Sequence, residues 1–145
     1  MATSQINFHT IVLPVRPQPD TIVAIFLLKH FGNEKFPGVA GTQYAFWPTL
    51  PTGKTSDQCF AEGYILIDLG GGIFDHHNKT IRITASALVC QYLEISDHPS
   101  LGKLLAYAQR DDFYGQGTVS DDTLDRAFGL SGLIAALNKS WPTEP

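Results

Sequence analysis

Four residues that can bind metal or phosphate lie close together near the middle of this chain of 145 residues. Asp68 is followed, after a run of glycines, by the consecutive residues Asp75, His76 and His77. Carboxylate oxygens and imidazole nitrogens are ligands of Mn, Fe, Zn and Mg ions, and ligands close in sequence converge with little loop closure. The pattern favours a metal or phosphate site. The alternative, an acidic helix cap beside two surface histidines, stays open at this point.

A buried strand and a glycine turn must position this cluster. Residues 64–67 have the length and the β-branched content of a buried strand, so Asp68 falls where that strand ends. The glycines at 70–72 permit positive φ and close backbone approach. Phe74, directly before the Asp-His-His triplet, indicates that the chain re-enters the core there.

A second acidic pair follows a helical pattern further along the chain. Apolar residues recur at helical spacing from Leu101 to Ala108 and predict a helix that delivers Asp111 and Asp112 to a turn marked by Gly115. Carboxylates at a helix C-terminus oppose the helix dipole, so their presence there needs another reason. A functional role and a solvated helix end are both kept as interpretations.

The rest of the chain alternates between strand and helix signals. Besides the strand at 64–67, we predict strands over 8–15 and 38–47, and helices over 21–31, from 84 or 86 to 93, 101–108 and 123–137. Residues 54–60 are ambiguous. The alternation predicts an α/β chain, a single-domain layered fold over 1–145 with a mainly parallel central sheet flanked by helices. Ligands of such folds gather at the carboxyl ends of the strands.

Several polar residues are expected to be structural. Asp20 is predicted to cap the helix at 21–31, and Asp121 and Asp122 to cap the last one, which bends at Gly129 or Gly132. The N-terminus of the helix ending at 93 should point back toward the Asp-His-His cluster and favour an anion there. His9, within the first strand, is expected to be a paired structural histidine.

Composition narrows the classes of function. A net charge of -4 gives no basic surface, so binding to long nucleic acid is disfavoured and small anionic substrates fit better. The two cysteines are widely separated and are expected to be reduced. The longest apolar run, 22–28, is too short to span a membrane, and no signal peptide is recognisable. We therefore expect a cytoplasmic protein with no membrane partner.

The order of these motifs resembles the DHH phosphoesterase superfamily, named for its Asp-His-His triplet. That superfamily includes single-strand exonucleases, nanoRNases, cyclic-dinucleotide phosphodiesterases and manganese-dependent pyrophosphatases. The resemblance covers roughly residues 9 to 137. The family's motifs correspond here to Gln18-Pro-Asp20, Asp68, the triplet Asp75-His76-His77, and Asp111-Asp112.

The resemblance implies a set of metal ligands. They would be Asp20, Asp68, His76 and one of Asp111 or Asp112, of which Asp112 is favoured. Two-metal members hold a further ion with a histidine and an aspartate where this chain has Pro14 and Gln18, so we expect one divalent ion, Mn²⁺ before Mg²⁺ or another metal.

The resemblance also implies roles around the phosphate. His77 would contact it and Asp75 would orient a histidine. Apart from the resemblance, Arg82, Lys79 and Arg16 are candidate anion contacts by proximity in sequence alone, and solvated surface positions are an equally open interpretation of all three. Gln18 would lie at the substrate side of the site, in the position of the missing carboxylate.

Two functions follow from this resemblance. The first is a metal-dependent phosphohydrolase or phosphodiesterase acting on a small nucleotide or short oligonucleotide. The second is a degenerate module that binds a metal or nucleotide without hydrolysing it. Family enzymes usually carry a second, substrate-gripping domain, and 145 residues leave no room for one, so a partner subunit in a homo-oligomer is one way to close the site.

Overall fold

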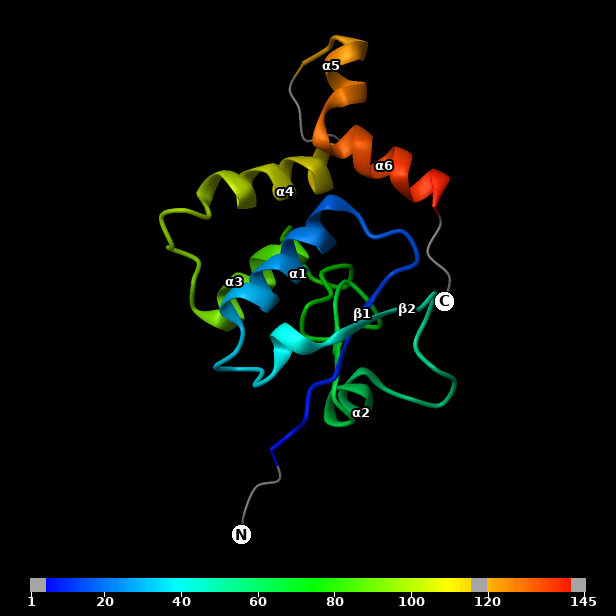
Figure 1. The fold of residues 1–145 in the computed structure, drawn as a ribbon, viewed down its shortest axis with the longest axis vertical. Helices are drawn as coiled ribbons and strands as arrows, with labels where there is room; N and C mark the ends of the chain where they lie inside the picture. The colour runs from blue at the N-terminus through cyan, green and yellow to red at the C-terminus, as the bar shows by residue number, and fades with distance from the viewer. Residues whose placement is uncertain (1–4, 116–119, 142–145) are drawn as a thin grey trace.

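The centre of the molecule is a sheet of three parallel strands (Figure 1). This computed structural model describes residues 5–115 and 120–141. The strands are β1 (Thr10–Leu13), β2 (Gln43–Phe46) and β3 (Tyr64–Leu66), in the order β2-β1-β3. In the register of the sheet, Ile11 of β1 lies beside Tyr44 on one side and Ile65 on the other. The predicted α/β fold with a mainly parallel sheet is therefore confirmed.

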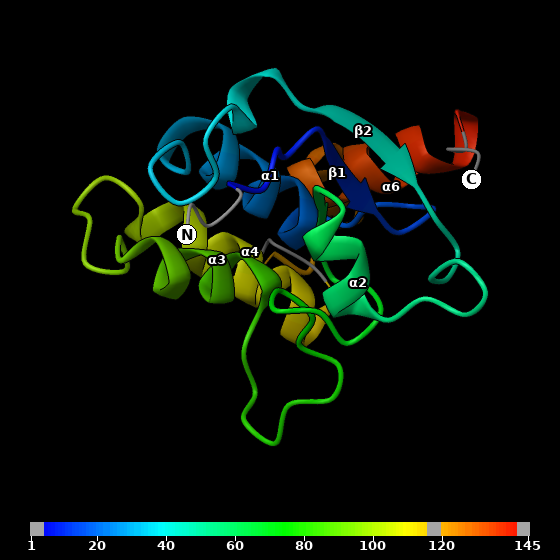
Figure 2. The ribbon, with the colours of Figure 1, turned by 90° about the horizontal axis from the view of Figure 1, so that it is seen from below.

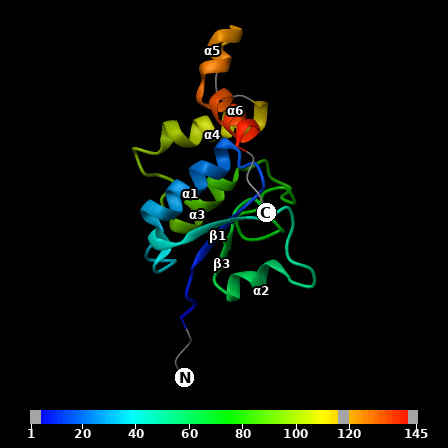
Figure 3. The same cartoon turned by 45° about the vertical axis from the view of Figure 1, so that its right-hand side comes forward.

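Both faces of the sheet are covered, which explains why its strands read as continuous apolar runs. Ile11 and Ile65 face the larger core, with α1 (Pro19–Phe31), α3 (Ala85–Leu93) and α4 (Gly102–Tyr114). Val12 and Leu66, one position along each strand, face the smaller core with Cys59 of α2 (Ser56–Ala61). Figures 1 and 3 show α2 on the side of the sheet away from the other three helices.

The connection from β3 to α3, residues 67–84, carries the Asp-His-His triplet. It contains no helix, and it extends from the body of the domain as the bright green loop in Figure 2. The loop begins at the carboxyl end of β3, where Ile67 forms an isolated bridge with Phe74. Phe74 is fully buried, so the chain returns to the core before the triplet, as its sequence indicated.

Several element boundaries differ from the sequence predictions. The stretch predicted as a strand over 38–47 is a short 3-10 helix, η1 (Val39–Gly41), followed by β2. The ambiguous 54–60 segment contains α2, whose N-terminus is closed by a capping box between Thr55 and Gln58. The acidic pair was expected in a turn but lies in the last turn of α4, which ends at Gly115 in the left-handed conformation.

The C-terminal part of the described chain forms two helices, α5 (Thr123–Phe128) and α6 (Leu130–Ser140), beyond the end of α4 (Figures 1 and 3). The predicted helix bends at Gly129, which caps α6, and Asp122 caps α5 by accepting hydrogen bonds from Leu124 and Asp125. None of the residues in these two helices is buried. Apolar side chains exposed on them are Leu124, Phe128, Leu130, Leu133 and Leu137.

The predictions for His9 and for the two cysteines are confirmed. His9 is paired, with Nδ1 2.7 Å from the Thr10 hydroxyl and Nε2 3.0 Å from the Glu62 carbonyl oxygen. Cys59 and Cys90 are buried and free of disulfides. Within residues 5–115 and 120–141, no helix is both long and apolar enough to cross a membrane.

Candidate metal centre

Asp68 sits at the carboxyl end of β3 in a backbone conformation that most residues avoid. Its φ is 56°, in the left-handed region, where aspartate and asparagine are several-fold enriched among non-glycine residues. Its amide donates to the carbonyl oxygen of Phe74 at 3.1 Å, which closes the glycine turn. The turn thus fixes the direction of the Asp68 carboxyl group through the backbone.

Asp75 organises the loop that carries the triplet. It is buried, one carboxylate oxygen accepts from the Gly71 amide at 2.7 Å, and the other accepts from the His77 amide at 3.1 Å and the His77 ring Nδ1 at 2.7 Å. Burial on its own would raise the pKa of Asp75, but the hydrogen bonds from Gly71 and His77 outweigh it and hold the pKa below its ordinary value. In return, the bond to Asp75 raises the pKa of His77.

His76 and Asp68 meet at the centre of the site. His76 Nε2 lies 2.9 Å from Asp68 Oδ1, and His77 Nδ1 lies 3.4 Å from the same oxygen. Nevertheless, Asp68 Oδ1 is buried and forms no hydrogen bond with any described residue. Burial raises the pKa of Asp68 to about 6, although His76 and His77 oppose this by favouring the carboxylate.

Asp20 is buried at the start of α1, and the prediction that it caps this helix is wrong. The N-cap of α1 is Gln18, with Asp20 in the first turn, and the Asp20 carboxylate instead caps α3. Its Oδ2 accepts from the Ala85 amide at 2.7 Å, and its Oδ1 accepts from the Ser86 amide at 2.9 Å and from the Ser86 hydroxyl. The anion expected at the α3 N-terminus is therefore a side chain of the protein itself.

These hydrogen bonds still leave Asp20 able to bind an ion. Each carboxylate oxygen has two lone pairs, and Oδ2 uses only one of them, toward Ala85. One ligand atom each from Asp20, His76 and Asp112 lie within 4.8 Å of one another. Asp20 can therefore hold the start of α3 against α1 and, at the same time, offer a carboxylate lone pair to a metal ion.

The acidic pair on α4 divides between two places. Successive helix residues point about 100° apart, so Asp111 and Asp112 cannot face the same way. Asp112 Oδ1 lies 3.9 Å from His76 Nε2, and desolvation raises the pKa of Asp112. Asp111 belongs to neither of the two ligand groups found among the described residues and instead lines a large cavity next to them.

The donor set fits a divalent cation. One ligand group contains Asp68, His76 and His77, and the other contains Asp20, His76 and Asp112, so His76 is common to both. Metal–ligand bonds of about 2.1 Å at right angles place neighbouring ligand atoms about 3 Å apart. The 2.9 Å contact between Asp68 and His76, which lacks hydrogen-bond geometry, matches that spacing.

The candidate anion contacts are less well placed. Arg82 donates to the Phe113 carbonyl oxygen at 2.7 Å, and its guanidinium lies over the Phe113 and Tyr114 rings, so it braces the loop against the end of α4. Lys79 lines a hollow of about 360 Å³ together with His76 and His77.

Neither Gln18 nor Pro14, which occupy the positions of the further metal ligands implied by the resemblance, offers a side-chain ligand to the site. The Gln18 side chain donates to the Arg16 carbonyl oxygen at 3.3 Å and lines the large cavity. The Pro14 side chain has no atom that can bind a metal ion. The Arg16 carbonyl oxygen already accepts the hydrogen bond from Gln18.

Sequence reasoning gave Ser86 no role beyond that of a candidate helix cap and missed Arg126. Ser86 holds Asp20 from the first turn of α3, and its position after the Asp-His-His loop was the available signal. Arg126 lines the large cavity, but no local pattern pointed to it because the contact depends on how α5 and α6 fold back.

Comparisons with protein-family models, with curated proteins and with solved structures gave no match. The resemblance to the DHH superfamily therefore stays a prediction, and the geometry of the site is what supports a function.

Proposed function

We propose that this protein is a metal-dependent phosphoesterase of the DHH type, acting on a small nucleotide or a short oligonucleotide. The observation that supports it most is Asp68 Oδ1, a buried oxygen that accepts no hydrogen bond from the described residues and lies 2.9 Å from an imidazole nitrogen. An unsatisfied buried carboxylate oxygen is costly, and a cation at this position would compensate it. The left-handed backbone of Asp68 is of the kind retained at functional sites.

In this proposal Asp20, Asp68, His76 and Asp112 would hold one divalent ion. Such an ion, when bound, polarises a phosphate oxygen and lowers the pKa of bound water. The mixture of three carboxylates and one imidazole suits Mn²⁺, with Mg²⁺ as the alternative.

His77 would bind the substrate phosphate. Its Nδ1 is fixed by Asp75, so Nε2 remains for a ligand, and the side chain is 62% exposed beside the site. Because Asp75 raises the pKa of His77, the ring carries protons on both nitrogens over a wider pH range and can donate to a phosphate oxygen. Lys79, in the same hollow, would add a positive charge.

A second function is favoured by one observation. Gln18 stands where the resemblance would place a carboxylate, and its amide is turned toward the Arg16 carbonyl. A chain with only half of a two-metal site can bind a metal or nucleotide without hydrolysing it.

The proposal includes a cytoplasmic location, for which the two buried free cysteines are the support. It also allows a homo-oligomer. The exposed apolar side chains of α5 and α6 support this, because a second copy of the chain could cover them.

The test is metal content together with hydrolysis on the same sample. The purified protein is stripped with chelator, reloaded with Mn²⁺, and analysed for ions per chain and for hydrolysis of bis(p-nitrophenyl) phosphate. We expect one ion per chain, and loss of both ion and turnover in His76→Ala. His30→Ala is the matched control, because His30 is exposed at the end of α1 and outside both ligand groups.

The outcomes separate the two functions. One ion with turnover supports the phosphoesterase, and one ion without turnover supports the binding module. Turnover that survives in His76→Ala, or no bound ion in the wild type, contradicts the assignment. In the inactive case, Gln18→Asp with Pro14→His should increase the ions bound per chain, since aspartate is also tolerated at the N-cap position that Gln18 occupies.

A further inference from the structure

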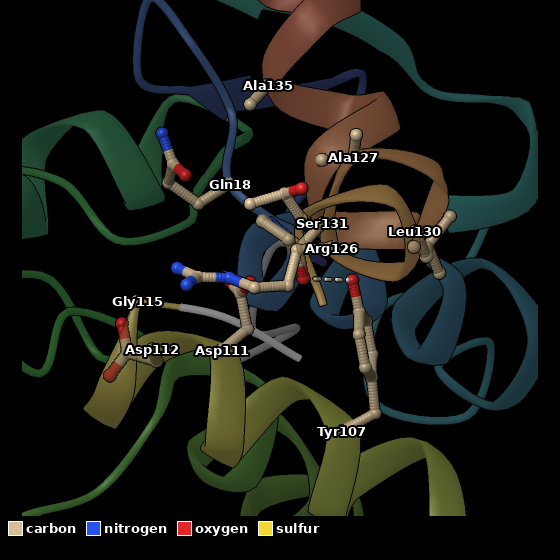
Figure 4. A pocket seen from close by; sticks show the side chains of 14 residues that line it. Gln18, Tyr107, Asp111, Asp112, Gly115, Arg126, Ala127, Leu130, Ser131 and Ala135 are labelled. Atoms are coloured by element: carbon tan, nitrogen blue, oxygen red, sulfur yellow. Dashed lines mark hydrogen bonds between the residues drawn. The ribbon is translucent and has the colours of Figure 1, made fainter. Parts of the chain in front are cut away.

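A cavity of about 830 Å³ lies between the start of α1, the end of α4 and the helix pair α5–α6 (Figure 4). Its size is within the range of small-molecule sites, about 300–1,000 Å³. The polar side chains that line it are Gln18, Tyr107, Asp111, Asp112, Thr123, Arg126 and Ser131. The metal ligand set accounts for Asp112 alone among these.

Asp111 is the most telling residue in this cavity. It is only 8% exposed, and its side chain rises from α4 into the cavity in Figure 4. No described residue donates a hydrogen bond to its carboxylate or forms an ion pair with it. A buried carboxylate without a partner is unfavourable, so a ligand that donates hydrogen bonds to Asp111 would stabilise it.

Arg126 supplies the opposite charge. Its guanidinium extends from α5 across the cavity toward Gln18 and Asp111, yet it forms no ion pair with Asp111 in the described chain (Figure 4). The N-terminus of α6 opens on the same cavity at Gly129 and Leu130, and no described side chain caps it. Uncapped amide groups and the helix dipole favour an anion there.

These features together define the ligand. A simple anion would be repelled by Asp111 and a simple cation by Arg126, so the cavity suits a molecule with an anionic group at one end and hydrogen-bond donors at the other. Neighbouring hydroxyl groups are the usual partners of a buried carboxylate in sugar recognition, as for the ribose of dinucleotides.

We propose that this cavity binds a phosphorylated sugar or polyol. Arg126 and the N-terminus of α6 would hold the phosphate, and Asp111 would accept hydrogen bonds from the hydroxyl groups. Asp112 lines the cavity and also belongs to the metal group, so the two sites adjoin. That the bound phosphosugar is one end of the hydrolysed substrate rests on the proposed function, whereas binding itself does not.

The test uses the full chain without metal, so that no phosphate is held by a metal ion, and shifts at the cavity residues distinguish binding there from binding at His77 and Lys79. Amide NMR titrations with glycerol 3-phosphate and with propyl phosphate compare two ligands that share a phosphate and a three-carbon chain but differ in hydroxyl groups. We expect the wild type to bind glycerol 3-phosphate about tenfold more tightly, as one hydrogen bond to a charged group implies. The largest shifts should lie at Leu130 and Gly132.

Two variants assign the roles. Asp111→Leu should abolish the preference for glycerol 3-phosphate, and Arg126→Gln should weaken both ligands by about tenfold or more. Lys139→Gln is the matched control, because it removes a positive charge from α6 away from the cavity and should change neither affinity.

Equal affinity of the wild type for the two ligands, an unchanged Arg126→Gln variant, or no binding at millimolar ligand would overturn the proposal. These results are separable from the metal experiment. If the cavity does not bind glycerol 3-phosphate but manganese-dependent hydrolysis is observed, only the cavity proposal is refuted. If the cavity binds glycerol 3-phosphate but the reloaded protein contains no manganese, only the proposed hydrolytic function is refuted.

Discussion

Asp68→Asn should make the metal-free protein more stable while it removes the metal site. The pKa of Asp68 rises from 3.8 to about 6 in the folded protein because of burial, so ionisation of this carboxyl group opposes folding. The corresponding free energy is about 3 kcal/mol at neutral pH, at about 1.4 kcal/mol per pKa unit. Solvent reaches the open side of the site and reduces this to about 1–2 kcal/mol.

The sign follows from proton linkage. A group with a raised folded pKa contributes stability in its protonated form, and that contribution is lost as the pH rises from 3.8 through about 6. Asparagine does not ionise, and it tolerates the left-handed φ of 56° at least as well as aspartate. The stability gain of Asp68→Asn should therefore grow over this interval and then level off.

The assay is urea unfolding of wild type and Asp68→Asn in chelator, from about pH 4 to about pH 8. Asp97→Asn, which removes the same charge from an exposed position, should show no such pH-dependent difference. Added Mn²⁺ should reverse the order, because an ion that binds only the folded wild type raises its free energy of unfolding. A metal-free Asp68→Asn variant that is less stable than wild type at neutral pH would refute the reasoning.

Three further changes test other parts of the site. Asp20→Ala should lower the free energy of unfolding by about 2–4 kcal/mol in urea titrations, since two amides at the α3 N-terminus lose their acceptor; a neutral result would contradict the capping role. Asp75→Asn should lower the pKa of His77 in an NMR titration, because the hydrogen bond that the His77 ring donates to the Asp75 carboxylate is what raises it. An unchanged pKa would count against this pairing. Gly132→Ala should lower the midpoint of thermal unfolding, since the new Cβ would lie 2.5 Å from a backbone oxygen of α5. Gly102→Ala is the control, because its Cβ would meet no atom within 4 Å and should leave stability unchanged or slightly raised.

The features of this protein that depend on local pattern could be predicted from its residues alone. Apolar runs bounded by prolines and glycines specified β1 and β3, and their alternation with helical periodicity specified a parallel sheet. Asp68 could be placed at a strand end, and the Asp-His-His triplet beside it, because all four residues belong to one short segment. Capping by Asp122 and the bend at Gly129 could also be predicted from the local sequence.

Contacts between segments that are distant along the chain could not be predicted in this way, because they depend on how the helices and strands pack. Asp20 looks like a cap for the helix that it begins, yet it binds the start of α3, 65 residues away. The rotation of α4 against α1 brings Asp112 close to His76 but not Asp111, although the two are neighbours in sequence and both line the cavity. Arg126 reaches that cavity because α5 and α6 turn back over the end of α4. Periodicity fixes which residues form an element, but packing between elements fixes its rotation, and that rotation determines which polar side chains meet.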